Sequence, residues 1–244
     1  MLIINADDWG QSRVETDAAL SCYKKGRITS VSAMIFMKDS VRAAELAKET
    51  GIDVGLHLNL TQRFLGEVRS ERLMEYHERI IRFLTFNKYA FLVYNPVLRN
   101  QFRYVYQAQF DEFLKLYGKP PSHIDGHHHQ HLCANMLLDR IIPEGQKVRR
   151  NFYFWPREKN FVNRTYRRLV DLWLARSYRL TDFFFDISQC LQHDRLKQVT
   201  QLAKTAAIIE IMTHPANAVE YAYLMSDRFV EDLGILEKGT YSSF

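Results

Sequence analysis

Short apolar segments alternate with helical ones from the start of the chain, and this alternation restricts the possible folds more than any other feature. Segment 2–6 is apolar and rich in isoleucine, which predicts a buried strand. Asp7 and Asp8 follow it in a polar turn, so both carboxylates are expected at the carboxyl end of that strand. Helical spacing over 14–25 and a strand pattern over 29–36 complete one βαβ unit.

The same alternation continues along the chain. A helix is predicted over 40–49 and a strand over 52–60, with His57 near the end of that strand. Residues 70–117 have a long helical pattern whose aromatic side chains are expected in the core, namely Phe102, Tyr106, Phe110, Phe113 and Tyr117. Further strands are expected over 122–126, 147–152, 181–187 and 206–212, and further helices over 161–177 and 191–204.

Strands and helices in this order predict an α/β fold with a parallel sheet, either open or closed into a barrel. A chain of 244 residues is expected to form a single domain spanning 1–244. Active groups in such folds lie at the carboxyl ends of the strands. The candidate functional residues discussed next all fall at such ends.

The composition excludes several classes of protein. With 47% hydrophobic and 25% charged residues, the chain has enough apolar surface for a core, so disorder is not its main state. A net charge of +5 does not indicate a nucleic-acid partner. Cys22, Cys133 and Cys190 are too few and too far apart for a disulfide framework, which favours a reducing compartment. No signal peptide or membrane span is recognised, so we expect a cytoplasmic protein.

Five of the nine histidines lie in the segment His-Ile-Asp-Gly-His-His-His-Gln-His, residues 123–131. An extended segment would place alternate residues, including Asp125 and His127, on one face. A helical turn after Gly126 would instead bring His127 and His131 to the same side. Either geometry offers imidazole to a metal ion.

Histidine together with aspartate is typical of sites for zinc and other divalent metals. Asp7 and Asp8, His57 and the histidine cluster supply such a set at three strand ends, although each taken alone also fits a polar turn or a satisfied histidine. His214 is followed by proline and directed off the end of a strand, which makes it a candidate general acid.

Segment 147–179 carries ten basic residues among many aromatic ones. Such a segment could bind nucleic acid, anionic lipid, or a sugar on a phosphate or lipid carrier. We favour a solvated helix face with an aromatic inner face. Trp155 could provide a stacking surface for a sugar ring.

Four stretches together resemble the signature segments of the YdjC-like carbohydrate deacetylase family. They are Asn5-Ala6-Asp7-Asp8-Trp9-Gly10, Gly55-Leu56-His57-Leu58-Asn59-Leu60, the histidine segment 123–131, and Met212-Thr213-His214-Pro215. The resemblance extends from residue 2 to about residue 216 and depends on the combination. It implies an irregular (β/α) barrel and removal of the N-acetyl group from an acetylated amino sugar, in an oligosaccharide or a lipid-linked glycan.

The resemblance also assigns roles. Asp8, His57 and His127 are the implied ligands of one divalent metal ion, either magnesium or zinc, and Asp7 is the implied catalytic base. The related NodB-type deacetylases suggest His131 as an alternative ligand. Asp125 is expected to orient a ligand imidazole, and His214 to protonate the leaving amine.

Other functions remain open from the sequence. A metal-dependent hydrolase of another amide or ester would use the same residues, and a catalytically inactive sugar-binding protein could keep the same scaffold. Two histidine ligands favour a transition metal, whereas magnesium prefers oxygen ligands. The expected partner is the sugar substrate rather than nucleic acid, and a homo-oligomer is expected.

Overall fold

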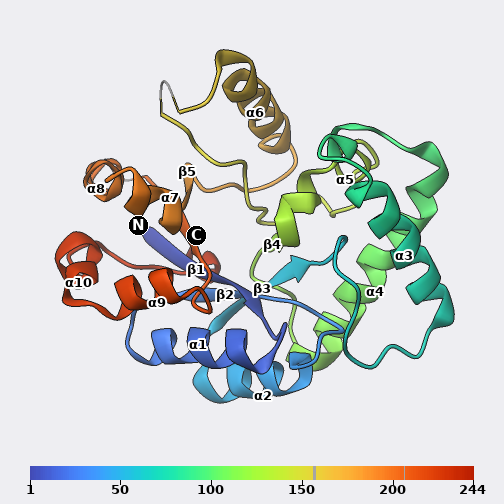
Figure 1. Cartoon of the computed structure of the whole chain (residues 1–244), viewed down its shortest axis with the longest axis horizontal. Helices are drawn as coiled ribbons and strands as arrows, with labels where there is room; N and C mark the ends of the chain where they lie inside the picture. The colour runs from blue at the N-terminus through green and yellow to red at the C-terminus, as the bar shows by residue number, and fades with distance from the viewer. Residues whose placement is uncertain (156–157, 206) are drawn as a thin grey trace. The chain divides into compact units, whose positions relative to one another are not determined.

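Six parallel strands alternate with helices in the computed structural model, which describes residues 1–155, 158–205 and 207–244 (Figure 1). This arrangement confirms the predicted α/β fold of the irregular (β/α) barrel type. The hydrogen-bonded strand order is β4-β3-β2-β1-β6-β5. The strands are β1 (Leu2–Trp9), β2 (Ser30–Ala33), β3 (Asp53–Leu58), β4 (Ile124–Gly126), β5 (Phe183–Asp186) and β6 (Ile209–Thr213).

The chain forms two compact units, which we describe separately. Unit 1 comprises Met1–Ala6, Asp17–Val31 and Glu144–Phe244, and unit 2 comprises Asp7–Thr16 and Ser32–Pro143. Strands β1 and β2 and helix α1 (Arg13–Lys24) each contribute residues to both units. The single domain predicted from chain length stays a prediction.

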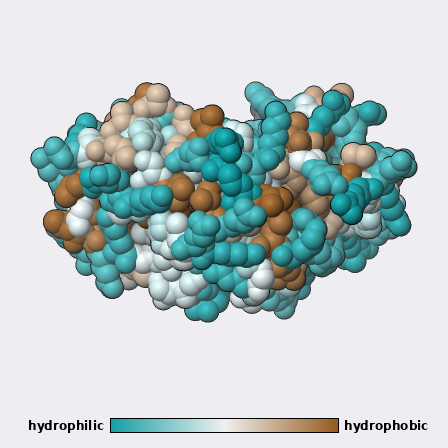
Figure 2. All heavy atoms as spheres, turned by 90° about the horizontal axis from the view of Figure 1, so that it is seen from below, coloured by the Kyte–Doolittle hydropathy of each residue, from teal (hydrophilic) through white to brown (hydrophobic). Residues whose placement is uncertain are grey.

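The helices of unit 2 are α2 (Ser40–Thr50), α3 (Glu71–Thr85), α4 (Arg99–Tyr117) and α5 (Ala134–Leu138), with 3-10 turns η1 (Ala90–Leu92), η2 (Pro96–Leu98) and η3 (His127–Leu132). Those of unit 1 are α6 (Phe161–Leu174), α7 (Ile187–Gln192), α8 (Leu196–Ala203), α9 (Ala218–Met225) and α10 (Asp227–Leu233), with the turn η4 (Tyr241–Ser243). On the face drawn in Figure 2, hydrophobic side chains lie in small groups among hydrophilic ones. No helix of the described residues is long and apolar enough to cross a bilayer.

Three of the predicted elements differ from the structure. The helix predicted over 191–204 is divided between α7, which ends at Gln192, and α8, which begins at Leu196. The long helical pattern over 70–117 forms two helices, α3 and α4. Helix α3 already ends at Thr85, and Asn95 caps a 3-10 turn that begins at Pro96, just before α4. Segment 147–152 is not a strand, although an isolated bridge joins Lys147 to Arg179. Apart from Phe110, which is partly exposed, the aromatic residues expected in the core are buried.

Segment 147–152 contributes one residue of a buried ion pair and does not form the predicted strand. Arg149 and Glu210 on β6 are both fully buried, and Arg149 Nε lies 2.7 Å from Glu210 Oε1. The hydroxyl of Tyr241 donates to the other oxygen of Glu210. Each charge is therefore paired and hydrogen-bonded, the condition under which charges are tolerated in a core.

Helices α3 and α4 lie side by side in unit 2 and together hold the end of β3 (Figure 1). The Gln109 side chain on α4 accepts from the Asn59 N–H at 2.8 Å and donates to the Asn59 carbonyl at 2.9 Å. His77 Nε2 on α3 lies 3.1 Å from the same carbonyl. These contacts fix the backbone two residues beyond His57.

Burial lowers the pKa of His77 from 6.5 to about 4, more than its hydrogen bond to Asn59 raises it. Between these two values the unfolded chain binds a proton at His77 and the folded chain does not, so stability is lost as the pH falls. From pH 7 to pH 5 we expect the wild type to lose about 2 kcal/mol more unfolding free energy than His77→Gln. Urea unfolding at a series of pH values measures this difference.

The matched control is His193→Gln, which removes an exposed histidine. This variant should keep the pH slope of the wild type. Equal slopes for the wild type and His77→Gln would contradict the prediction.

Candidate metal centre

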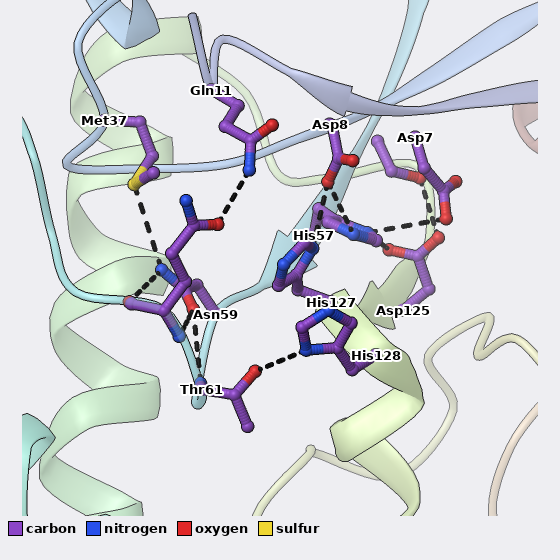
Figure 3. Close-up of polar contacts among 12 residues, drawn as sticks. Asp7, Asp8, Gln11, Met37, His57, Asn59, Thr61, Asp125, His127 and His128 are labelled. Atoms are coloured by element: carbon purple, nitrogen blue, oxygen red, sulfur yellow. Dashed lines mark hydrogen bonds and ion pairs between the residues drawn. The ribbon is translucent and has the colours of Figure 1, made fainter. Parts of the chain in front are cut away.

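The ends of three strands bring five acidic and histidine side chains of unit 2 together (Figure 3). Asp7 and Asp8 come from the end of β1, His57 from β3 and Asp125 from β4, and His127 is the first residue of the following 3-10 turn. Strands β3 and β4 are parallel, and their register pairs His57 with Asp125. Residues 119 positions apart thus become neighbours because their strands end at the same edge.

An unusual backbone conformation directs Asp8 into this group. Asp8 has a φ of +65°, the left-handed region that aspartate tolerates better than most residues. The turn interrupts the alternation of side chains along β1, so two successive carboxylates reach the same imidazole. Asp8 Oδ1 lies 3.4 Å from His57 Nε2, and Asp7 Oδ2 lies 4.0 Å from His57 Nδ1.

The His57 ring is held by a chain of buried polar groups. Its Nδ1 lies 2.8 Å from Asp125 Oδ1, and Ser32 donates to the other oxygen of Asp125 at 2.8 Å. The Ser32 hydroxyl also lies 3.0 Å from His123 Nε2. His123 packs so closely on β3 that a Cβ on Gly55 would meet its ring at 2.2 Å, which explains the glycine at that position. Asp125 was expected from the sequence, whereas no motif marks Ser32.

The histidine segment follows neither of the two predicted geometries as a whole. Its strand ends at Gly126, and the 3-10 turn after it is kinked because His128 and His129 adopt φ values of +53° and +57°. His127 Nδ1 lies 3.0 Å from Asp8 Oδ1, whereas His128 contacts Thr61 at 3.0 Å. His131 is buried and belongs to neither group of described residues that could hold a metal ion.

The carboxylates and imidazoles of this centre shift one another's pKa values. Burial would raise the pKa of Asp8, but hydrogen bonds from His127 and His57 and the positive charge of the imidazoles hold it far below its usual range. Burial would likewise lower the pKa of His57, but the charges of Asp125 and Asp7 and its hydrogen bonds to Asp125 and Asp8 raise it to about 10. The carboxylates around His57 therefore favour a positive charge at this position, in keeping with a site for a cation.

The donor set fits a divalent transition metal. Ligand atoms of Asp8, His57 and His127 all lie within 4.8 Å of one another. Ligand atoms about 2.1 Å from one ion are separated by roughly 3.0 to 3.4 Å, and the Asp8 oxygen lies 3.0 and 3.4 Å from the two imidazole nitrogens. Because Asp125 engages the Nδ1 of His57, the Nε2 lone pair of that ring can face an ion. A second group, Asp7, His57 and Asp125, would require this hydrogen bond to break.

His214 and Trp155 belong to unit 1, and their relation to this centre is outside what the structure describes. Glu220 accepts from the His214 backbone N–H at 2.6 Å and from the Thr213 hydroxyl at 2.8 Å, and it lies 4.0 Å from His214 Nδ1. This glutamate lies outside every sequence motif and was not expected from the sequence. The Trp155 ring stacks on Phe185, with ring centroids 4.9 Å apart, and the Arg195 guanidinium lies 5.3 Å from its centroid. The ring that was expected to stack on a sugar therefore already contacts two residues of unit 1.

Several known proteins are similar to this chain. The chain is 33% identical over 134 residues to a chitooligosaccharide deacetylase of Serratia marcescens, which covers 54% of this chain and 51% of that protein. A chitooligosaccharide deacetylase of Proteus mirabilis is 33% identical over 140 residues, 56% of this chain and 52% of that protein. The chain thus spans about half the length of these two relatives. A carbohydrate deacetylase of Mus musculus is 27% identical over 243 residues, 88% of this chain and 77% of that protein.

A solved structure from Enterococcus faecalis V583, described as a candidate cellobiose-phosphate cleavage protein, superposes with a TM-score of 0.68. The superposition covers 99% of this chain and 97% of the other at 20% sequence identity, which shows that the two share a fold. A family model described as YdjC-like protein matches residues 1–234. Because one family model spans nearly the whole chain, this protein belongs to the YdjC-like protein family.

Proposed function

We propose that this protein is a metal-dependent hydrolase that removes the N-acetyl group from an acetylated amino sugar, carried by an oligosaccharide or a lipid-linked glycan. The observation that carries the proposal is the meeting of Asp7, Asp8, His57, Asp125 and His127 at the ends of three strands. The relatives named carbohydrate or chitooligosaccharide deacetylase give the reaction class. The buried free thiols of Cys22, Cys133 and Cys190 are in keeping with a cytoplasmic location.

In this proposal Asp8, His57 and His127 hold one divalent cation, zinc or magnesium. The two imidazoles favour zinc or another transition metal over magnesium. When bound, the cation would acidify a water molecule and polarise the acetamide carbonyl. Asp125 keeps His57 in the tautomer whose Nε2 is a ligand, while His131, which lies outside the group, is the less suitable alternative.

Asp7 is the proposed general base. Its carboxylate is buried beside His57, and its chain neighbour Asp8 is a proposed ligand, so it can take the proton from the attacking water. The leaving amine then needs a proton, for which His214 is the proposed donor because an imidazole can serve as a general acid. Glu220 holds the His214 backbone and would orient it. Trp155 stays a proposed substrate contact.

Removing a proposed ligand should abolish tight metal binding. We expect Asp8→Ala and His57→Ala each to weaken the affinity for Zn²⁺ at least 100-fold, because two ligands remain where three are needed. Asp125→Asn should weaken it about 10- to 100-fold by releasing the His57 ring. Isothermal titration of the metal-stripped chain and elemental analysis of the purified protein measure both effects.

Two variants serve as matched controls for this experiment. Asp111→Ala removes an exposed carboxylate and His193→Ala an exposed imidazole, and both should bind the metal like the wild type. Unchanged affinity in Asp8→Ala would rule out the proposed ligand set.

Replacing the proposed base should separate catalysis from metal binding. We expect Asp7→Asn to keep the metal and to lower the rate of acetate release about 10²- to 10⁴-fold, the usual contribution of a general base. A panel of N-acetylated amino sugars, free and lipid-linked, measures this rate by enzymatic detection of acetate. Asp111→Asn, which removes a carboxylate outside the site, should retain full activity.

The outcomes distinguish the proposed reaction from its alternatives. Normal acetate release by Asp7→Asn would eliminate Asp7 as the base. Hydrolysis of other amides or esters, but of no acetylated sugar, would make the protein a different metal-dependent hydrolase. Sugar binding without any hydrolysis would make it an inactive binding protein on the same scaffold.

A further inference from the structure

Helix α6 exposes its apolar side instead of burying it. Phe161, Val162, Leu169 and Leu172 are 78%, 74%, 61% and 56% exposed, and their spacing places them along one side of the helix. We call these four residues the apolar stripe. The buried residues of α6 are Asp171 and Leu174. The sequence predicted the opposite, an aromatic inner face with a solvated outer one, so that interpretation is wrong.

Nothing in the described part of unit 1 covers this stripe. No other helix of the described residues of that unit packs along α6, which stands apart from α7 to α10 in Figure 1. Exposed apolar side chains are ordinary when single, but four on one helix face mark a surface that binds something.

Positive charge is concentrated in the same part of the chain. Segment 147–179 contains ten of the 33 basic residues and two of the 28 acidic ones, so it carries a net charge of +8. The rest of the chain carries a net charge of −3. The modest total charge of the protein therefore conceals a strongly basic region around α6.

The basic side of α6 borders a cleft of about 370 Å³ in unit 1. Arg164, Arg167 and Arg168 line it from the helix, and Phe152, Phe154 and Phe183 are among the residues that complete its lining. Arg167 is held in place, because its Nε donates to Asn163 at 2.9 Å and its guanidinium lies over the Phe154 ring at 5.1 Å. Among the described residues, no carboxylate pairs with Arg164 or Arg168. These two charges are therefore available to an anionic ligand.

We propose that α6 is an interfacial helix that docks the protein on an anionic lipid bilayer. The apolar stripe enters the boundary between headgroups and acyl chains, and Arg164 and Arg168 bind lipid phosphates beside it. The helix lies along the surface without crossing it, in accord with its length of 14 residues. This docking does not depend on the reaction proposed for unit 2.

The combination of features favours lipid over other partners. Nucleic acid is bound through charge and through stacking on aromatic rings, neither of which needs exposed valine and leucine. Anionic bilayers match both an apolar stripe and flanking arginines, which is the pattern of surface-bound amphipathic helices. The inner leaflet of a cell membrane carries such a negative surface, in keeping with the proposed cytoplasmic location.

Flotation with lipid vesicles tests this docking. We expect the full chain to float with vesicles of phosphatidylcholine and phosphatidylserine in a 7:3 ratio, to float far less with pure phosphatidylcholine, and to dissociate as salt rises. Leu169→Glu with Leu172→Glu should lower the fraction bound at least tenfold. Arg164→Gln with Arg168→Gln should lower the affinity about 10- to 30-fold, about fivefold for each charge.

The controls match these changes outside α6. Val219→Glu places a negative charge on an equally exposed apolar residue of α9, and Lys24→Gln with Lys25→Gln removes two exposed positive charges. Both should retain most of the binding of the wild type. All variants alter exposed or partly exposed residues, and circular dichroism and metal affinity verify that each chain is folded.

Fluorescence quenching measures whether the apolar stripe enters the bilayer. Trp173 is partly buried and lies next to the apolar stripe on the helix, so phosphatidylcholine with brominated acyl chains, mixed with phosphatidylserine, should quench its fluorescence. Trp173→Phe should remove most of the quenching and keep the flotation. The proposal is overturned if the stripe variant floats like the wild type, or if the wild type binds neither vesicle. It is equally overturned if the wild type binds no vesicles and light scattering shows a homo-oligomer that Leu169→Glu with Leu172→Glu converts to monomers.

Discussion

The imidazole of His57, held between two carboxylates, is the contact on which the candidate site depends. Asp125 engages its Nδ1 at 2.8 Å and Asp8 lies 3.4 Å from its Nε2, so both the position and the orientation of the ring are determined. Burying an imidazole with this much negative charge is favourable only if it carries a proton or binds a cation. The same carboxylates would thus stabilise a divalent ion bound to the Nε2 of this ring.

Backbone strain surrounds this contact. Asp8, His128 and His129 all adopt left-handed conformations that cost side-chain-bearing residues about 1 kcal/mol or more each. The strain has visible consequences: it turns the Asp8 carboxylate towards His57 and separates His127 from the histidines that follow it. Hydrogen bonds outside the site, such as those that Gln109 and His77 make to Asn59, keep the neighbouring strand end rigid. Positioning of this kind is what a reaction centre requires.

Unit 1 differs from unit 2 in its use of charge. Its core contains the fully buried pair Arg149 and Glu210, completed by the Tyr241 hydroxyl. The arginines of α6 instead line a cleft, and the apolar residues of that helix face outward. If α6 docks on a bilayer, a lipid-linked substrate would be encountered at the surface where the enzyme resides. The two proposals would then describe one enzyme that works at a membrane.

The sequence by itself determined the α/β class and the candidate residues at the strand ends, because both depend on local patterns. Short apolar segments rich in β-branched residues favour buried strands, and polar residues that follow such a strand lie at the edge of the sheet. Only the tertiary structure showed the contact between His127 and Asp8, because no sequence pattern marks the left-handed residues His128 and His129 that kink the turn. It alone showed Ser32 and Glu220, single residues in no motif that act through contacts with distant or neighbouring strands. It also decided the orientation of α6, because a helical pattern identifies an apolar side but cannot say whether that side faces the core or the solvent.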